Sequence, residues 1–184
     1  MYLKLISLLP LMLAGCSSSP YVFDYSDQPE PTVREIRVDH QQARLSYMDD
    51  LSVVVSSLLP DFEVERMGLT KLRITVPESY GFETGSDFMS RSLRDKLKPL
   101  ADMLLEYRGA RIQILGHTDN VGNEAFNRDL SHRRAISVVD LLAWYGVDRA
   151  RMTPVAEFYE VPRCTNQNAI GRECNRRVEI ILES

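Results

Sequence analysis

The segment between Gly116 and Arg134 holds the side chains with the clearest capacity for binding chemistry. Asp119 follows a run, 111–115, in which polar and apolar residues alternate as they do in a half-buried strand. Ser131 precedes an apolar repeat that is typical of a helix, so we expect Ser131 to be the N-cap and Arg134 to lie in the first helical turn. A cation is unfavourable at that positive end of the helix dipole, which indicates a compensating anion.

A carboxylate and a guanidinium would flank one small pocket if the intervening loop folds the strand end against the helix start. Asp119 would then bind an ammonium group, while Arg134 and the amides of the helix N-terminus would bind a carboxylate. The predicted chemistry is reversible binding of a zwitterion. The alternative is that the two side chains pair with each other or cap nearby backbone, because ion pairs at protein surfaces are common.

Several motifs occur in a fixed order along the second half of the chain. They are Phe82-Glu83-Thr84-Gly85-Ser86, His117-Thr118-Asp119, Gly122, Asn127, Leu130-Ser131, Arg134-Ala135, Val138, Leu142, Gly146 and Asn175-Arg176-Arg177-Val178-Glu179-Ile180. With these motifs, the region 62–184 resembles the peptidoglycan-binding domain shared by OmpA C-terminal regions, peptidoglycan-associated lipoproteins and MotB-type stator proteins.

The resemblance implies that Asp119 and Arg134 bind the free end of meso-diaminopimelate in the peptidoglycan stem peptide. It implies that further residues line the pocket, and the ones we assign are Thr118, Asn127, Leu130 and, from the closing arginine pair, Arg177. Each has an alternative role. Thr118 and Asn127 could instead hydrogen-bond within the loop, Leu130 could form a hydrophobic staple with Ala135, and an arginine of the pair could be a structural partner of an acidic group.

The first fifteen residues have the layout of a secretory signal, with one lysine and an apolar run from Leu5 to Leu13 that is too short to span a bilayer. The ending Leu13-Ala14-Gly15-Cys16 resembles a bacterial lipoprotein signal. That resemblance implies cleavage before Cys16 and acylation of Cys16, for example with palmitate, and Ser17 favours sorting to the outer membrane. The alternative is a soluble protein with a plain signal peptide.

Residues 16–38 are rich in Ser, Pro, Asp and Gln without an apolar period, so we expect a flexible tether after the lipidated cysteine. From Ser17 to Leu69 the chain has ten acidic and four basic residues, which argues against a nucleic-acid partner. Residues 39–61 form a pre-domain segment, in which His40 to Leu59 has the apolar spacing of an amphipathic helix. We expect this helix to pack on the following domain, and pairing with another copy or a partner is the alternative.

The domain itself, 62–184, shows alternating and helical patterns in succession. The expected elements are a hairpin (62–66 and 71–76), a helix (90–107) that Pro99 bends or breaks near Lys96, the strand 111–115, a helix that ends at Gly146, and strands at 153–157 and 177–182. This order predicts an α/β (α+β) sandwich with helices on one face of a mixed β-sheet, which is also the fold that the resemblance implies.

Cys164 and Cys174 form an even pair once Cys16 is acylated, and similar domains carry a disulfide at this place. We therefore expect a disulfide, with two free thiols as the alternative. We expect no metal, because no histidine or third cysteine has ligand spacing nearby, and no cofactor.

Catalysis is not expected. His117, Asp119 and Ser131 are the residue types of a hydrolase triad, but no Gly-x-Ser-x-Gly elbow is present. We therefore expect an outer-membrane lipoprotein whose periplasmic domain binds peptidoglycan and anchors the envelope, or an envelope machine, to the wall. The alternative is an OmpA-like interaction lipoprotein of a secretion or motility complex, in which wall binding is secondary or lost.

Overall fold

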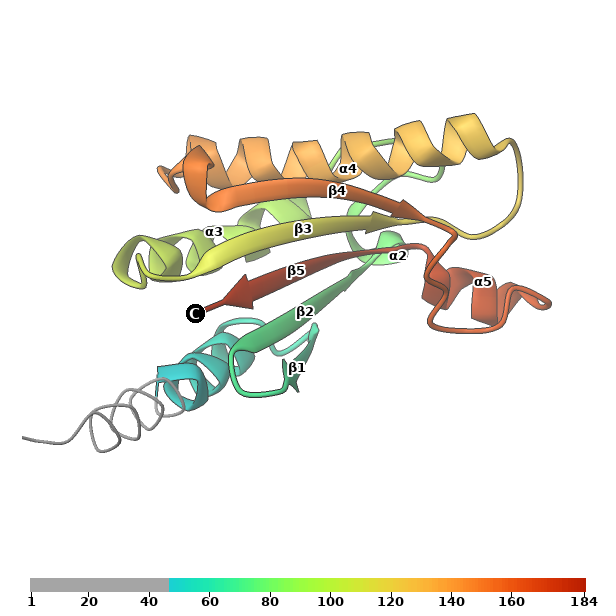
Figure 1. The fold of residues 1–184 in the computed structure, drawn as a ribbon. Helices are drawn as coiled ribbons and strands as arrows, with labels where there is room; N and C mark the ends of the chain where they lie inside the picture. Colours follow the sequence, from blue (N-terminus) through green and yellow to red (C-terminus); the bar gives the residue numbers. More distant parts are fainter. Residues whose placement is uncertain (1–46) are drawn as a thin grey trace, which may run out of the picture.

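The computed structural model describes residues 47–184, which form a five-stranded mixed sheet with helices on one face (Figure 1). The strands are β1 (Glu63–Met67), β2 (Lys71–Pro77), β3 (Arg111–His117), β4 (Met152–Phe158) and β5 (Arg177–Glu183). Their order in the sheet is β1-β2-β5-β3-β4, and the β3–β4 pair is parallel while the other three pairs are antiparallel. The predicted fold class is confirmed.

The core lies between this sheet and its helices. Along β2, Leu72, Ile74 and Val76 are buried in the core, while the alternate residues, among them Arg73 and Thr75, belong to the opposite face of the sheet. The helices are α2 (Glu78–Gly81), α3 (Arg91–Glu106), α4 (Glu124–Trp144) and α5 (Ala169–Asn175), with a short 3-10 turn, η2 (Arg149–Arg151).

Helix α3 runs without interruption through Pro99, so the predicted break near Lys96 is wrong. The proline lacks the amide that would bind the carbonyl of Asp95. Asp95 is exposed, so water can replace the missing donor there. Leu97 and Leu100 are fully buried beside it, and their packing keeps the two halves of the helix in one element.

Residues 47–58 are helical, and the remainder of the predicted helix, 40–46, lies outside the described residues. Met48, Leu51 and Val55 are fully buried in the same core as the strands. The apolar side of this segment therefore packs on the sheet domain and is not a free surface. The predicted signal peptide (1–15) and the predicted tether with Cys16 (16–38) also lie outside the described residues.

Helix α4 begins at Glu124, with Asn123 as its N-cap, so the predicted start at Ser131 is wrong. The side chain of Asn123 accepts a hydrogen bond from the amide of Phe126. Ser131 lies inside the helix, where its hydroxyl donates to the carbonyl of Arg128 at 2.8 Å. Consequently Arg134 is not in the first turn, and the argument from the helix dipole does not apply to it. The predicted staple between Leu130 and Ala135 fails for the same reason, because both residues lie within α4.

Candidate functional site

Four charged side chains from four different segments form a continuous chain of ion pairs. Nη1 of Arg176 lies 2.8 Å from Oδ2 of Asp119, and Nε of the same arginine binds Oε2 of Glu78. The other oxygen of Glu78 binds Nη2 of Arg134. The order is therefore Asp119, Arg176, Glu78, Arg134, with alternating sign. Of the two predicted alternatives, a direct Asp119–Arg134 pair is wrong, whereas bonding to nearby backbone is found for Asp119, which accepts the amide of Val121.

The strand order places three of these residues next to one another. β5 lies between β2 and β3, and Arg177 is in register with both Pro77 and His117. The segments that adjoin these three positions therefore meet at one end of the sheet. Glu78 directly follows β2 and donates its amide to the carbonyl of Arg176 at 2.9 Å.

Arg134 is brought to this end by a close approach of α4 to β3. A Cβ atom at Gly116 would lie 1.9 Å from the carbonyl oxygen of Ser131, so a side chain at position 116 would collide with the helix backbone. The absence of a side chain lets the two backbones touch. Because Ser131 and Arg134 are three residues apart on α4, this contact also fixes where Arg134 lies relative to the end of β3.

Arg134 is 1% exposed and is fixed by several contacts. Its Nε donates to the carbonyl of Ser86 at 2.8 Å, and Nη2 also reaches the carbonyl of Glu83 at 3.3 Å. The ring of Phe82 lies 5.2 Å from its Cζ, within the range of a cation–π contact. The loop 83–86 therefore uses its carbonyls to hold this arginine, and Nη1 has no hydrogen bond to any other residue of 47–184.

Asp119 is held in place by its own loop. Its Oδ1 accepts a hydrogen bond from the amide of Val121 at 3.0 Å, which leaves Oδ2 for Arg176. Asn127 is buried, and its side-chain amide donates to the carbonyls of Val121 (2.9 Å) and Asp119 (3.4 Å). In the structure Asn127 thus has the loop-bonding role that was its alternative interpretation.

Thr118 and Leu130 occupy different environments beside this loop. The amide of Thr118 donates to the carbonyl of Phe158, whereas its buried hydroxyl has no hydrogen-bond partner in the described part of the chain. Leu130 is 4% exposed on the inner side of α4. Thr118 thus has an unused buried polar atom, and Leu130 contributes packing.

The arginine beside Asp119 is Arg176, not the predicted Arg177. Neighbouring residues near the start of a strand point to opposite sides, so only one of the pair can face Asp119. Nε of Arg177 donates to Oε1 of Glu179 at 2.7 Å, and its Nη2 reaches the carbonyl of Val161. Arg177 is therefore the structural partner of an acidic group. Sequence reasoning missed Glu78 altogether, because no local pattern connects it to residues near position 176.

The charged neighbours of Arg176 also explain its ionisation. Burial by itself would lower the pKa of this guanidinium, but hydrogen bonds from it to Asp119 and Glu78 outweigh that effect and raise the pKa. Arg176 therefore remains a cation while its side chain is 31% exposed, whereas the side chain of Arg134 is 1% exposed.

His117 points away from Asp119. Its Nε2 lies 3.8 Å from Oε2 of Glu179, and neither ring nitrogen has a hydrogen bond among the described residues. Burial lowers the pKa of His117 to about 4, and the nearby positive charge of Arg177 acts in the same direction. Since the hydroxyl of Ser131 is bound to a backbone carbonyl, His117, Asp119 and Ser131 are not arranged as a triad.

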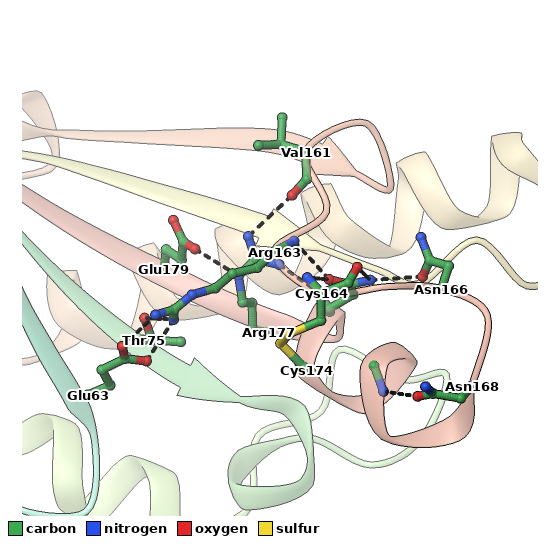
Figure 2. Close-up of a disulfide and its surroundings, with 12 residues drawn as sticks. Glu63, Thr75, Val161, Arg163, Cys164, Asn166, Asn168, Cys174, Arg177 and Glu179 are labelled. Atoms are coloured by element: carbon green, nitrogen blue, oxygen red, sulfur yellow. Dashed lines mark hydrogen bonds and ion pairs between the residues drawn. A yellow bond between two sulfur atoms is a disulfide. The ribbon is translucent and has the colours of Figure 1, made fainter.

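The predicted disulfide between Cys164 and Cys174 is present, and a buried asparagine reinforces it (Figure 2). Oδ1 of Asn175 accepts hydrogen bonds from the backbone amides of Arg163 and Cys164, both at 2.9 Å. Nδ2 of Asn175 donates to the carbonyl of Cys164 and to Oδ1 of Asn166. These contacts order the backbone that leads directly into Arg176.

The segment before this disulfide loop is also bonded to the edge strand β1. The guanidinium of Arg163 binds both carboxylate oxygens of Glu63 and reaches the hydroxyl of Thr75 at 3.3 Å (Figure 2). The disulfide loop thus connects the site end of β5 to the edge strand β1.

Residues 81–176 match the sequence profile of the OmpA family. The chain belongs to the OmpA family. The match includes Asp119, Arg134 and Arg176, whereas Glu78 precedes it. The family resemblance expected from the motifs is confirmed.

Three similar proteins illustrate the range of this OmpA-family domain. Outer membrane porin F of Pseudomonas aeruginosa is 42% identical over 89 residues, which are 48% of this chain and 25% of the porin. The probable lipoprotein YiaD of Escherichia coli is 32% identical over 109 residues, which are 59% of this chain and 50% of YiaD. The matches thus span half or less of these curated relatives.

The third is a solved structure, the cell wall anchor of the T6SS from Pseudomonas aeruginosa. It superposes with a TM-score of 0.63 at 28% identity, and the match covers 71% of this chain and 96% of the anchor. The OmpA-family fold of this chain therefore extends over nearly the whole of that anchor structure.

Neither a membrane-spanning helix nor a metal-binding cluster is found between residues 47 and 184. None of the helices there has the length and apolar character needed to cross a membrane. The same part of the chain has no group of three or more His, Cys, Asp or Glu residues that could hold a metal ion. The candidate site is the chain of ion pairs formed by Asp119, Arg176, Glu78 and Arg134.

Proposed function

We propose that this OmpA-family protein binds the diaminopimelate head of the peptidoglycan stem peptide without covalent chemistry. The observation that supports the proposal best is the pairing of charges in one site. Asp119 offers a carboxylate for an ammonium group, and Nη1 of Arg134 remains available for a carboxylate. A zwitterionic head matches both, with a charge-assisted hydrogen bond at each end.

Thr118 and Arg176 belong to the same proposed surface. The buried hydroxyl of Thr118, the residue before Asp119, has no partner in the described part of the chain and could accept or donate a hydrogen bond to the head group. Leu130 and Asn127 support the proposed site from α4, and Asn127 does so by fixing the loop. We do not include Arg177, because its guanidinium is bound to Glu179.

We further propose that the protein is a lipoprotein, acylated at Cys16 and anchored in the outer membrane, with the OmpA-like domain in the periplasm. The support is the signal-like sequence up to Cys16 and the similarity to a probable lipoprotein. Together the lipid and the site would link the membrane to the wall, or would fix an envelope machine to it. Incorporation of radiolabelled palmitate that is lost in Cys16→Ser tests the anchor.

Cosedimentation with purified diaminopimelate-type peptidoglycan tests wall binding. The full-length protein in detergent is the appropriate form, because Met48, Leu51 and Val55 belong to the core and a fragment starting at Phe62 would lack them. Wild type should sediment with the wall, while Asp119→Ala and Arg134→Lys should remain largely in solution.

Matched controls for these variants are available on exposed helix and loop positions. Asp102→Ala and Arg149→Lys make the same replacements at residues whose side chains are 57% and 61% exposed and lie in surface ion pairs. They should sediment like wild type, at equal folded content by circular dichroism. Wild-type protein that stays in solution would overturn the proposed function.

A further inference from the structure

Arg176 occupies the place that an ammonium group would need. Its Nη1 lies 2.8 Å from Oδ2 of Asp119, and the other oxygen of that carboxylate accepts the amide of Val121. An ammonium that approaches Asp119 therefore has to displace this guanidinium. Displacement of one cation by another contributes little to the free energy of binding, because the new ion pair replaces an equivalent one.

Glu78 determines what happens to the displaced arginine. Its two oxygens already bind Arg134 and Arg176, so the four-residue chain has two negative and two positive charges. If an ammonium group alone takes Asp119, two guanidiniums remain on the single carboxylate of Glu78, and the site has gained a net positive charge. A ligand that brings a carboxylate with its ammonium restores the balance.

The two arginines differ in their freedom to respond. Arg134 is 1% exposed and is fixed by two backbone carbonyls, whereas the side chain of Arg176 is 31% exposed and its guanidinium is bound to the two acidic groups. Arg176 can therefore leave Asp119 while its Nε stays on Glu78. Its released Nη1 then faces the carboxylate of the incoming head group.

We propose that Arg176, held by Glu78, makes this site selective for a zwitterionic head over an ammonium group alone. This inference rests on the proposed wall-binding function and adds its selectivity. The relevant ligand classes are peptides that end in diaminopimelate and peptides that end in lysine, since the two side chains differ by the carboxylate next to the terminal amine. Arg176 is a specificity-determining residue in this scheme.

The test is calorimetric binding of two synthetic tripeptides, Ala-γ-Glu-meso-diaminopimelate and Ala-γ-Glu-Lys, to the full-length protein in detergent. Wild type should prefer the diaminopimelate peptide. Arg176→Gln exposes Asp119 and should bind the lysine peptide about two- to fivefold more tightly, as expected for loss of a partly exposed competing ion pair. The ratio of the two affinities should fall by at least that factor.

Two further variants separate selectivity from folding. Arg176→Lys keeps a cation beside Asp119 and should recover most of the wild-type preference. Arg172→Gln removes the same charge from α5, where the side chain donates to the carbonyl of Asn166, and should leave both affinities unchanged. Thermal unfolding confirms that each variant is folded.

Each remaining outcome overturns the inference in a recognisable way. A folded Arg176→Gln with the wild-type ratio of affinities overturns it and leaves the proposed function standing. Loss of both peptides in Arg176→Gln also overturns it, because Arg176 would then be a contact for any head group. Wild type that binds neither peptide removes the proposed function and the selectivity together.

Discussion

Asp119 and Arg134 are connected through two intervening side chains rather than through an ion pair of their own. Arg176 and Glu78 stand between them, so each end of the chain of charges retains a group of defined sign. Asp119 is paired with Arg176 and Arg134 with Glu78, so a zwitterion has to compete with these two pairs. The arrangement makes the two intervening residues as important to test as the two ends.

Glu78→Ala should strongly destabilise the protein. The substitution leaves two guanidiniums, one of them almost fully buried, without their shared carboxylate. Removal of one partner from a buried ion pair typically costs about 3–5 kcal/mol of stability. Because Arg176 is partly exposed, we expect the free energy of unfolding to fall by about 3 kcal/mol. Urea unfolding followed by circular dichroism measures it. Glu83→Ala, an exposed side chain, is the control, and equal stability of the two variants would contradict the prediction.

Gly116→Ala should disrupt the contact between β3 and α4. The new methyl group would lie 1.9 Å from the backbone oxygen of Ser131, which cannot rotate away. We expect the free energy of unfolding to drop by about 3 kcal/mol, the upper part of the usual range for overpacking. Gly109→Ala, where a Cβ meets nothing within 4 Å, should be neutral or slightly stabilising. Similar melting temperatures for both variants would refute the role of this contact.

Leu51→Ala should show that residues 47–58 are part of the folded core. The side chain is fully buried, so its truncation should reduce the free energy of unfolding by about 2–5 kcal/mol. Val53→Ala on the same helix removes a side chain that is 71% exposed and should change stability by less than about 0.5 kcal/mol. Chemical denaturation of both variants is the measurement, and a neutral Leu51→Ala would mean that the helix is dispensable.

His117 should make the protein sensitive to mild acid. Burial, assisted by Arg177 and Arg73 and opposed by Glu179, lowers the pKa of His117 to about 4 in the folded state, below the value of about 6.5 expected for the unfolded chain. Between these two values the unfolded state binds more protons. The free energy of unfolding therefore decreases as the pH falls from 6.5 to 4, and His117 accounts for about 3 kcal/mol of this decrease. Above pH 6.5 the titration of His117 does not affect stability.

Unfolding curves at several pH values between 4 and 7.5 measure this effect. In His117→Gln the dependence on pH should be shallower than in wild type by the same amount, whatever the variant does to stability at neutral pH. His132→Gln removes an exposed histidine from α4 and should keep the wild-type slope. Parallel curves for wild type and His117→Gln would show that the buried ring is not responsible.

Local patterns predicted the fold because each long element has its own apolar period. The strands and α3 follow from alternation and from leucines at helical spacing, and these signals do not depend on distant residues. The start of α4 could not be placed in this way. Its first residues, 124–126, are exposed although two of them are apolar, and the buried Asn127 is polar, so no apolar period marks the start. Both Asn123 and Ser131 are residue types that cap helices.

The site was predictable only in part for a related reason. Asp119 and Arg134 lie within one compact motif, whereas Glu78 and Arg176 are 98 residues apart and meet through the register of β2 with β5. Register depends on the whole sheet and is not encoded in any short segment. The choice between Arg176 and Arg177 required the same information, since a shift of one residue exchanges the two faces of a strand.

The position of β2 has a mechanical consequence. In Figure 1 the start of the described helix (cyan) lies at the opposite end of the molecule from the loop between β3 and α4, and β2 runs between these ends, from beside that helix to α2, which begins at Glu78. β2 is paired on both sides, with β1 and with β5, by antiparallel ladders whose hydrogen bonds run perpendicular to the strands. Tension between a membrane and a wall held at these two ends would load many of those bonds at once, in shear, instead of opening them one after another. With the proposed lipid anchor and wall-binding site at these two ends, the sheet would carry the pulling force along the direction in which it is hardest to tear.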